Sequence, residues 1–193
     1  VKDYESIIND NDLEKWINIL KEQSVIAVDT ETSSLNPLDA DLVGVSFSFA
    51  SNKACYIPLD HKNFKGLKKE LVLKKIKPIL EDPSIKKVGQ NIKFDFLILS
   101  QNNIEIKSLE DTMLISYTLD AGTNRHNLDT LSEIHLNHKT ISYKELVGTG
   151  KNKLNFSDIT LDKATEYAAE DADVTLRLYN YLRARLDEEK LNK

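Results

Sequence analysis

Three strand-like segments that follow one another closely constrain the fold of this chain more than any other feature. Residues 25–28 form a continuous apolar run, which is typical of a strand that is covered on both faces. Residues 43–49 alternate between apolar and small side chains, and residues 54–57 form a third apolar run that Pro58 ends. Because residues 32–41 are rich in Ser, Asn, Pro and Asp and predict a loop, we expect a meander rather than βαβ crossovers.

The rest of the chain is predicted to be mostly helical. Residues 86–89 indicate one more short strand. Apolar side chains recur at helical spacing in six segments, namely 9–20, 67–80, 92–99, 113–119, 128–136 and 161–186. Strands that come first, followed by one more strand among helices, are typical of a mixed sheet flanked by helices. With 193 residues, the chain is predicted to form a single α/β domain over 1–193.

Composition narrows the classes of protein to which the chain can belong. Its 40% hydrophobic and 30% charged residues are typical of a globular protein. No apolar stretch approaches the roughly 20 residues of a membrane helix, and the first residues lack the order of a signal peptide. The single cysteine, Cys55, excludes an internal disulfide and a CxxC metal site. We therefore expect a reducing, intracellular setting, and the absence of Met at position 1 suggests a fragment of a longer chain.

The charge balance is acidic, with 26 Lys and Arg against 31 Asp and Glu, a net charge of −5. This balance argues against a protein whose whole surface binds nucleic acid. It is compatible with a nuclease, because carboxylates that await divalent cations add negative charge that the ions neutralise.

The first candidate site lies where the first predicted strand ends, in Asp29-Thr30-Glu31. Residues two apart on a strand project to the same face, so Asp29 and Glu31 point together and Thr30 points away. Two adjacent carboxylates repel, which raises their pKa values unless a cation lies between them. Oxygen ligands of this kind suit Mg²⁺ or Mn²⁺. The alternative is that both are solvated residues at the end of a strand.

The second candidate site contains Asn91 and Asp95, which are four residues apart. In the first turn of a helix such residues are neighbours on one face. The alternatives are that Asn91 caps the helix and that the helix dipole favours Asp95 near its start.

The third candidate site contains Tyr167 and Asp171, which share one face of the longest predicted helix. The alanines around them permit this helix to lie close to the sheet, so that Asp171 reaches the acids of the first strand. Glu170 and Asp173 fall on other faces and are expected to be solvent-facing or structural. The alternative for Tyr167 is a core aromatic residue with its hydroxyl at the rim.

In combination, Asp29, Glu31, Asp95 and Asp171, with Tyr167 four residues before the last, match the pattern of the DEDD exonucleases in their Tyr-containing subgroup. Residues 25–186 resemble the 3′–5′ proofreading exonuclease domain of bacterial DNA polymerase I (family A). The resemblance is carried by the stretches VDTETSSLNP, LVGVSFSF, KVGQNIKFD, RHNLDTLSEIHLNHKTISY, GKNKLNF and YAAEDADVTL. It implies an RNase H-like fold and hydrolysis of DNA from the 3′ end, with two Mg²⁺ or Mn²⁺ ions, to release 5′-mononucleotides.

The resemblance also implies a role for each of the five residues. Asp29 bridges both ions, Glu31 and Asp171 complete the site that activates the attacking water, and Asp95 serves the second ion. Tyr167 orients the water. Because an unperturbed tyrosine has a pKa of about 10, it is a poor base at neutral pH, which favours positioning over proton abstraction.

Six further positions match residues that contact the DNA strand in the family: Leu35, Gln90, Asn91, Phe94, Arg125 and Tyr143. Leu35 matches an apolar wedge against the terminal bases. Arg125 suits a phosphate, and aromatic stacking contributes about 1–3 kcal/mol per base. The alternatives are that Leu35 and Phe94 are core residues and that Arg125 pairs with Asp129.

The resemblance implies a single-stranded or frayed 3′ end of DNA as substrate and a polymerase domain in the same natural chain. It further implies a monomeric fragment, no membrane, and the bacterial cytoplasm, or an organelle if the source is eukaryotic. Two alternatives are a catalytically silent module that binds single strands and an RNase D-like exoribonuclease. The intact set of acids argues against the first, and segment 125–156 disfavours the second. The four histidines are expected to be surface or core residues, without a metal site.

Overall fold

The computed structural model describes residues 1–191, and its centre is a six-stranded sheet with the order β1-β4-β3-β2-β5-β6. β2, β3 and β4 form an antiparallel meander, whereas β1, β5 and β6 each run parallel to a neighbour. The predicted mixed sheet and its meander are therefore confirmed. The strands are β1 (Asp3–Ser6), β2 (Val25–Thr32), β3 (Leu42–Ala50), β4 (Lys53–Pro58), β5 (Lys86–Gly89) and β6 (Leu109–Asp111).

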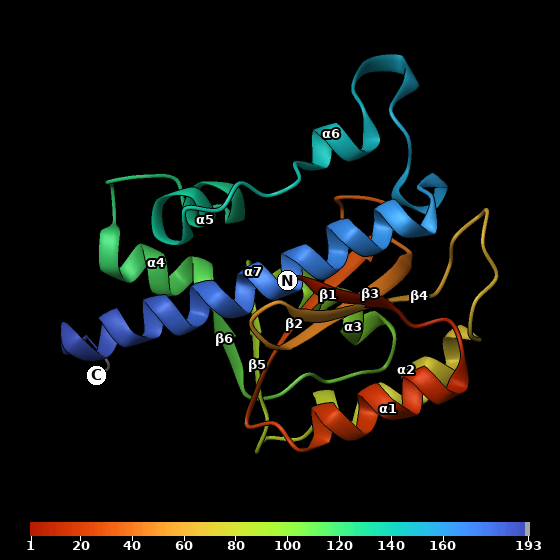
Figure 1. The fold of residues 1–193 in the computed structure, drawn as a ribbon, viewed down its shortest axis with the longest axis horizontal. Coiled ribbons are helices and arrows are strands. Elements are labelled where there is room, and N and C mark those ends of the chain that lie inside the picture. The colour runs from red at the N-terminus through yellow and green to blue at the C-terminus, as the bar shows by residue number, and fades with distance from the viewer. Residues whose placement is uncertain (192–193) are drawn as a thin grey trace.

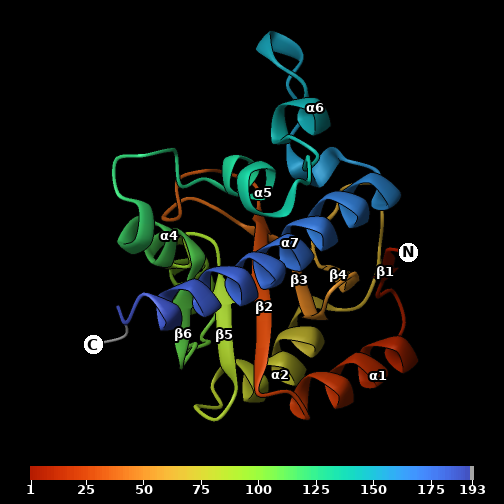
Figure 2. The ribbon, with the colours of Figure 1, turned by 60° about the vertical axis from the view of Figure 1, so that its left-hand side comes forward.

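Helices cover both faces of the sheet (Figures 1 and 2). One core lies between the sheet and α1, α2 and α3, and the opposite face is crossed by α7, beside which α4 and α5 pack. Within residues 1–191, no helix has both the length and the apolar character needed to cross a membrane. The helices are α1 (Asp10–Lys21), α2 (Lys69–Leu80), α3 (Lys93–Gln101), α4 (Thr112–Asp120), α5 (Leu128–Leu136), α6 (Tyr143–Val147) and α7 (Leu161–Glu188).

β2 is an interior strand whose alternating side chains separate the two cores. Ile26 and Val28 are fully buried in the core with α1, α2 and α3. Val25 packs in the other core, beneath α7. Because successive residues of a strand point to opposite faces, Asp29 and Glu31 share the α7 face, and Thr30 points to the α3 face, as the sequence predicted.

Small side chains let α7 lie close to the sheet. Ala164, Ala168 and Ala172 have no solvent exposure, and α7 packs against β2, β3 and β4. On the other face of the sheet, Trp16 is buried and its ring lies edge-on to that of Phe49 at 5.3 Å. The close approach of α7 brings its acidic residues to the end of β2.

The two shortest strands, β1 and β6, were not predicted from the sequence. β1 and β6 have four and three residues and no clear alternation, so their pairing with longer strands defines them. The helix predicted from residue 92 begins at Lys93, because Asn91 adopts a left-handed backbone with φ of 57°. The argument that placed Asn91 and Asp95 on one helical face is therefore wrong, although both still lie near the site described below.

Candidate active site

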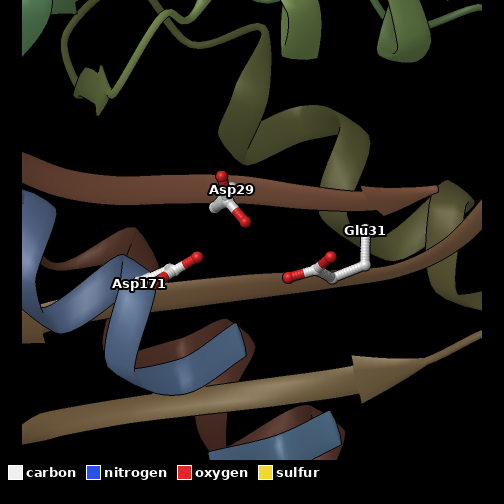
Figure 3. Close-up of side chains that lie close together, drawn as sticks. All are labelled: Asp29, Glu31 and Asp171. Carbon is white, nitrogen blue, oxygen red and sulfur yellow. The ribbon is translucent and has the colours of Figure 1, made fainter. Parts of the chain in front are cut away.

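Three carboxylates from two distant parts of the chain converge at the end of β2 (Figure 3). Asp29 and Glu31 come from β2 and Asp171 from α7, and one oxygen from each lies within 4.8 Å of the others. Glu31 is opposite Gly44 of β3. The ring of Tyr56 covers Gly44, so that a Cβ there would lie 2.1 Å from the tyrosine hydroxyl. This close approach explains why a glycine occupies the position.

Asp95 reaches the same strand from α3, on the opposite face. Its Oδ1 accepts hydrogen bonds from the backbone N–H of Thr30 at 2.8 Å and from the Thr30 hydroxyl at 2.6 Å. Asp95 is 2% exposed and lies close enough to Asp29 to raise the pKa of that residue. The structure thus brings three of the predicted acids into one cluster and holds the fourth immediately behind them.

The pKa values of all four acids are raised. Burial and, after it, repulsion from the neighbouring carboxylates raise the pKa values of Asp29 and Glu31 well above their usual range. Burial also raises the pKa of Asp95 to about 7 and that of Asp171 to about 8, against hydrogen bonds from Thr30 and Tyr167 that lower them. Such mutual repulsion is relieved when a cation lies between the oxygens.

A cavity of about 500 Å³ opens over the three carboxylates. It is lined by Asp29, Thr30, Glu31, Thr32, Ser34, Leu35, Asn91, Phe94, Asn127, Tyr143, Tyr167 and Asp171. Four of the six predicted DNA contacts are therefore in its wall: Leu35, Asn91, Phe94 and Tyr143. Leu35 is 79% exposed, which excludes the core alternative for that residue. Phe94 packs against the core as well as lining the cavity.

Gln90 and Arg125 lie outside this lining. The Nε2 of Gln90 donates to the backbone oxygen of His126 at 2.7 Å, and its Oε1 accepts from the Thr112 hydroxyl at 2.5 Å. Arg125 is exposed on the loop that Gln90 holds. Asp129, the alternative partner of Arg125, accepts a hydrogen bond from the Thr140 hydroxyl. A direct contact of Gln90 or Arg125 with a strand of DNA stays a prediction.

Sequence reasoning missed four polar residues of the cavity wall: Thr30, Thr32, Ser34 and Asn127. Asn127 lies two residues after Arg125 in one of the stretches that carried the resemblance, which is the signal that pointed to it. Thr32 and Ser34 lie in the stretch VDTETSSLNP, which also carried the resemblance, so the same signal was available for them.

Glu170 and Asp173 are 1% and 0% exposed. The expectation that they face solvent is wrong, and the structural alternative is right, because both accept several hydrogen bonds. Three of the histidines also have hydrogen-bond partners: His61 binds the Tyr56 hydroxyl at 2.7 Å, His126 binds the Ser116 hydroxyl at 2.8 Å, and His138 binds Glu170 at 3.0 Å.

The metal-free protein should lose stability as the pH rises. In the unfolded chain Asp171 releases its proton near pH 3.9, whereas its folded pKa is about 8. This contribution to the stability is complete below about pH 4 and is lost as the pH approaches 8. In EDTA, we expect the free energy of unfolding of Asp171→Asn, relative to wild type, to grow by roughly 1–3 kcal/mol between about pH 5 and 8. Urea unfolding measures this difference, and one that does not change with pH would contradict a raised pKa.

Comparison with known proteins identifies the family to which this chain is similar. The model of a family described as 3′–5′ exonuclease matches residues 4–187. DNA polymerase I of Rhizobium leguminosarum is 44% identical over 90% of this chain, which corresponds to 19% of that protein. DNA polymerase I of Pseudomonas aeruginosa is 40% identical over 96% of this chain and 21% of its own length. The chain thus spans about one fifth of the relatives that it matches.

A solved structure extends the likeness to the fold. Brucella melitensis NrnC with bound Mg²⁺ superposes with a TM-score of 0.70 at 22% sequence identity, over 100% of this chain and 85% of that one. The predicted RNase H-like α/β fold is confirmed. The extent of the family match and the identity to both polymerases show that this chain belongs to the 3′–5′ exonuclease domain family of DNA polymerase I.

Proposed function

We propose that this chain hydrolyses DNA from its 3′ end, releasing 5′-mononucleotides, and that it uses two divalent cations, Mg²⁺ or Mn²⁺. The observation that carries the proposal is the convergence of Asp29, Glu31 and Asp171 within 4.8 Å on the floor of a cavity of about 500 Å³. In this proposal residues 1–193 are one monomeric exonuclease domain, and its role is proofreading within a longer polymerase chain in the bacterial cytoplasm.

The donor set of the cluster fits hard cations. All three ligand atoms are carboxylate oxygens, which Mg²⁺ and Mn²⁺ prefer. Asp29, Glu31 and Asp171 would hold one ion, and Asp29 with Asp95 would hold the second. Bound cations lower the pKa of water and neutralise the charge that develops on a phosphodiester during in-line displacement. The chain itself supplies the fixed oxygens, because Thr30 holds Asp95 in place through two hydrogen bonds.

Tyr167 is suited to position a water molecule. Burial and then the neighbouring carboxylates raise the pKa of Tyr167 far above its usual value, so that the hydroxyl keeps its proton at neutral pH. Its one proton is donated to Asp171, so the hydroxyl oxygen can accept a hydrogen bond from a water molecule, but Tyr167 cannot act as a general base at neutral pH. A hydrogen bond with Asp171 and ring contacts with Tyr143 and Phe156 at about 6 Å hold it at the cavity wall.

We expect Tyr167→Phe to lower kcat by about tenfold, which is less than the loss of any carboxylate, because the acids remain in place. Single-turnover cleavage of a 3′-labelled DNA strand measures the effect. Tyr117→Phe is the matched control, since Tyr117 is 59% exposed and lies outside the cavity lining. A Tyr167→Phe variant that cuts at the wild-type rate would remove the tyrosine from the mechanism.

The cavity wall supports a DNA strand as substrate. Leu35 is an exposed apolar side chain beside two aromatic residues, Phe94 and Tyr143, and such surfaces stack with bases. The similar proteins are DNA polymerases, which favours DNA over RNA. With a net charge of −5, the isolated chain is expected to bind DNA weakly and with strong salt dependence, because a linked polymerase domain would deliver the frayed end.

The direct test is the shortening of a primer with a 3′ mismatch. We expect removal of one nucleotide at a time from the 3′ end in Mg²⁺ or Mn²⁺, and none in EDTA. DNA binding without shortening in either metal would indicate the silent binding module instead. Faster degradation of an RNA strand of matched sequence would indicate an exoribonuclease.

A further inference from the structure

Glu170 is a buried carboxylate that the chemistry proposed above does not use. It directly precedes Asp171 and is 1% exposed. Its Oε1 accepts hydrogen bonds from Lys2 Nζ at 2.5 Å and from His138 Nε2 at 3.0 Å, and its Oε2 accepts one from the backbone N–H of Ile141 at 2.7 Å. Burying a carboxylate costs desolvation free energy, which is offset only while its hydrogen bonds are kept. Glu170 therefore holds its three partners firmly.

The charge state of Glu170 agrees with this arrangement. Burial alone would raise the pKa of Glu170, but the hydrogen bonds from Lys2, Ile141 and His138 outweigh it and lower the pKa. The contact with Lys2 Nζ at 2.5 Å is an ion pair, and charge-assisted hydrogen bonds of this kind are stronger than neutral ones.

The segment that Glu170 binds leads directly into the cavity wall. Ile141 is followed by Ser142, whose side chain and backbone form a capping box with Glu145 at the start of α6. The first residue of α6 is Tyr143, which lines the cavity and whose ring lies 6.0 Å from that of Tyr167. A single residue, Ser142, thus separates the N–H held by Glu170 from an aromatic side chain of the wall.

The two neighbouring acids of α7 therefore face different parts of the site. Successive residues of a helix point about 100° apart, so Asp171 faces the carboxylate cluster when Glu170 faces residues 138–141. A single turn of α7 thus carries both Asp171, which is proposed to bind a cation, and Glu170, which contacts the segment that leads to Tyr143.

We propose that Glu170 is a positioning residue that holds the Tyr143 wall at the correct distance from the carboxylate cluster, and thereby sets the affinity for the 3′ end of the strand. This inference rests on the proposed function. It separates two effects: loss of Glu170 should weaken capture of the strand through Tyr143, and it should leave the chemistry at the carboxylates unchanged.

The test is a double-mutant cycle between Glu170 and Tyr143. We expect Glu170→Gln to raise the KM for a 3′-mismatched primer by about threefold to tenfold, with kcat within about twofold of wild type. In a Tyr143→Ala background the same change should alter KM by less than about twofold. Glu166→Gln is the matched control, because Glu166 is exposed and lies one turn earlier on α7. Thermal unfolding of each variant verifies that it is folded.

Three results would overturn the inference: a fall in kcat at constant KM, equal KM effects in both backgrounds, or no effect of Glu170→Gln in folded protein. If Glu170→Gln does not fold, His138→Ala removes one hydrogen bond of the three and should show a smaller KM effect with the same dependence on Tyr143. Fluorescence anisotropy with a labelled single strand in EDTA gives the same cycle as Kd values. If the chain binds the strand but does not cleave it in Mg²⁺, the proposed hydrolysis is refuted. The cycle of Kd values measured in EDTA still decides the role of Glu170.

Discussion

Asp29→Ala should lower the rate of 3′-end hydrolysis by about a thousandfold or more. Asp29 lies in the carboxylate cluster, and the charges of Asp95, Glu31 and Asp171 all act on it. Its loss removes the one carboxylate proposed to hold both cations. The fold should remain, and in EDTA the free energy of unfolding should rise, because a source of repulsion is gone.

Single-turnover cleavage in saturating Mg²⁺ measures the rate, and calorimetry measures the affinity for Mn²⁺. Asp41→Ala is the matched control, since Asp41 is an exposed acid directly before β3. It should cut at the wild-type rate. Cleavage by Asp29→Ala within about tenfold of wild type would show that the assignment of the metal site is wrong.

Asp95→Ala should cause a loss of similar size, about a hundredfold to a thousandfold, although Asp95 does not line the cavity. Its carboxylate lies behind Asp29 and is held by two hydrogen bonds from Thr30. We expect it to take up the second cation, so that its removal leaves an incomplete site. Cleavage as a function of Mg²⁺ concentration measures both the maximal rate and the metal requirement.

Thr30→Val tests the positioning of the Asp95 carboxylate without removing the carboxylate itself. It removes the hydroxyl that donates to Asp95 at 2.6 Å but keeps the backbone N–H that donates at 2.8 Å. We expect an intermediate loss, about threefold to thirtyfold, with a higher Mg²⁺ requirement.

If Asp95→Ala cut normally, the cluster of three carboxylates would be sufficient and Asp95 would have only a structural role.

The local pattern of the sequence was enough to place most elements. The apolar run before Asp29 predicted a buried strand, and β2 is an interior strand with both faces covered. The alanines near Asp171 predicted the close approach of α7, and they are fully buried on the sheet. These signals are local because period and side-chain size act within a few residues along the chain.

The parts that sequence reasoning missed depend on pairing at a distance. β1 is defined by its parallel register with β4, which nothing in Asp3–Ser6 indicates. Glu170 read as solvent-facing or structural because its partners, Lys2, His138 and Ile141, are far away in the chain. A periodicity argument assigns a residue to a side of a helix, but it cannot say what covers that side.

The sequence by itself identified the residues that we propose for the chemistry: four acids and a tyrosine, in an order and spacing typical of one exonuclease family. Only the tertiary structure decided how they are divided. Asp29, Glu31 and Asp171 meet under the cavity, and Asp95 approaches from the other face of β2. The reason is geometric, since the alternation of a strand fixes relative directions, whereas the layer that packs on each face selects the partners that those side chains reach.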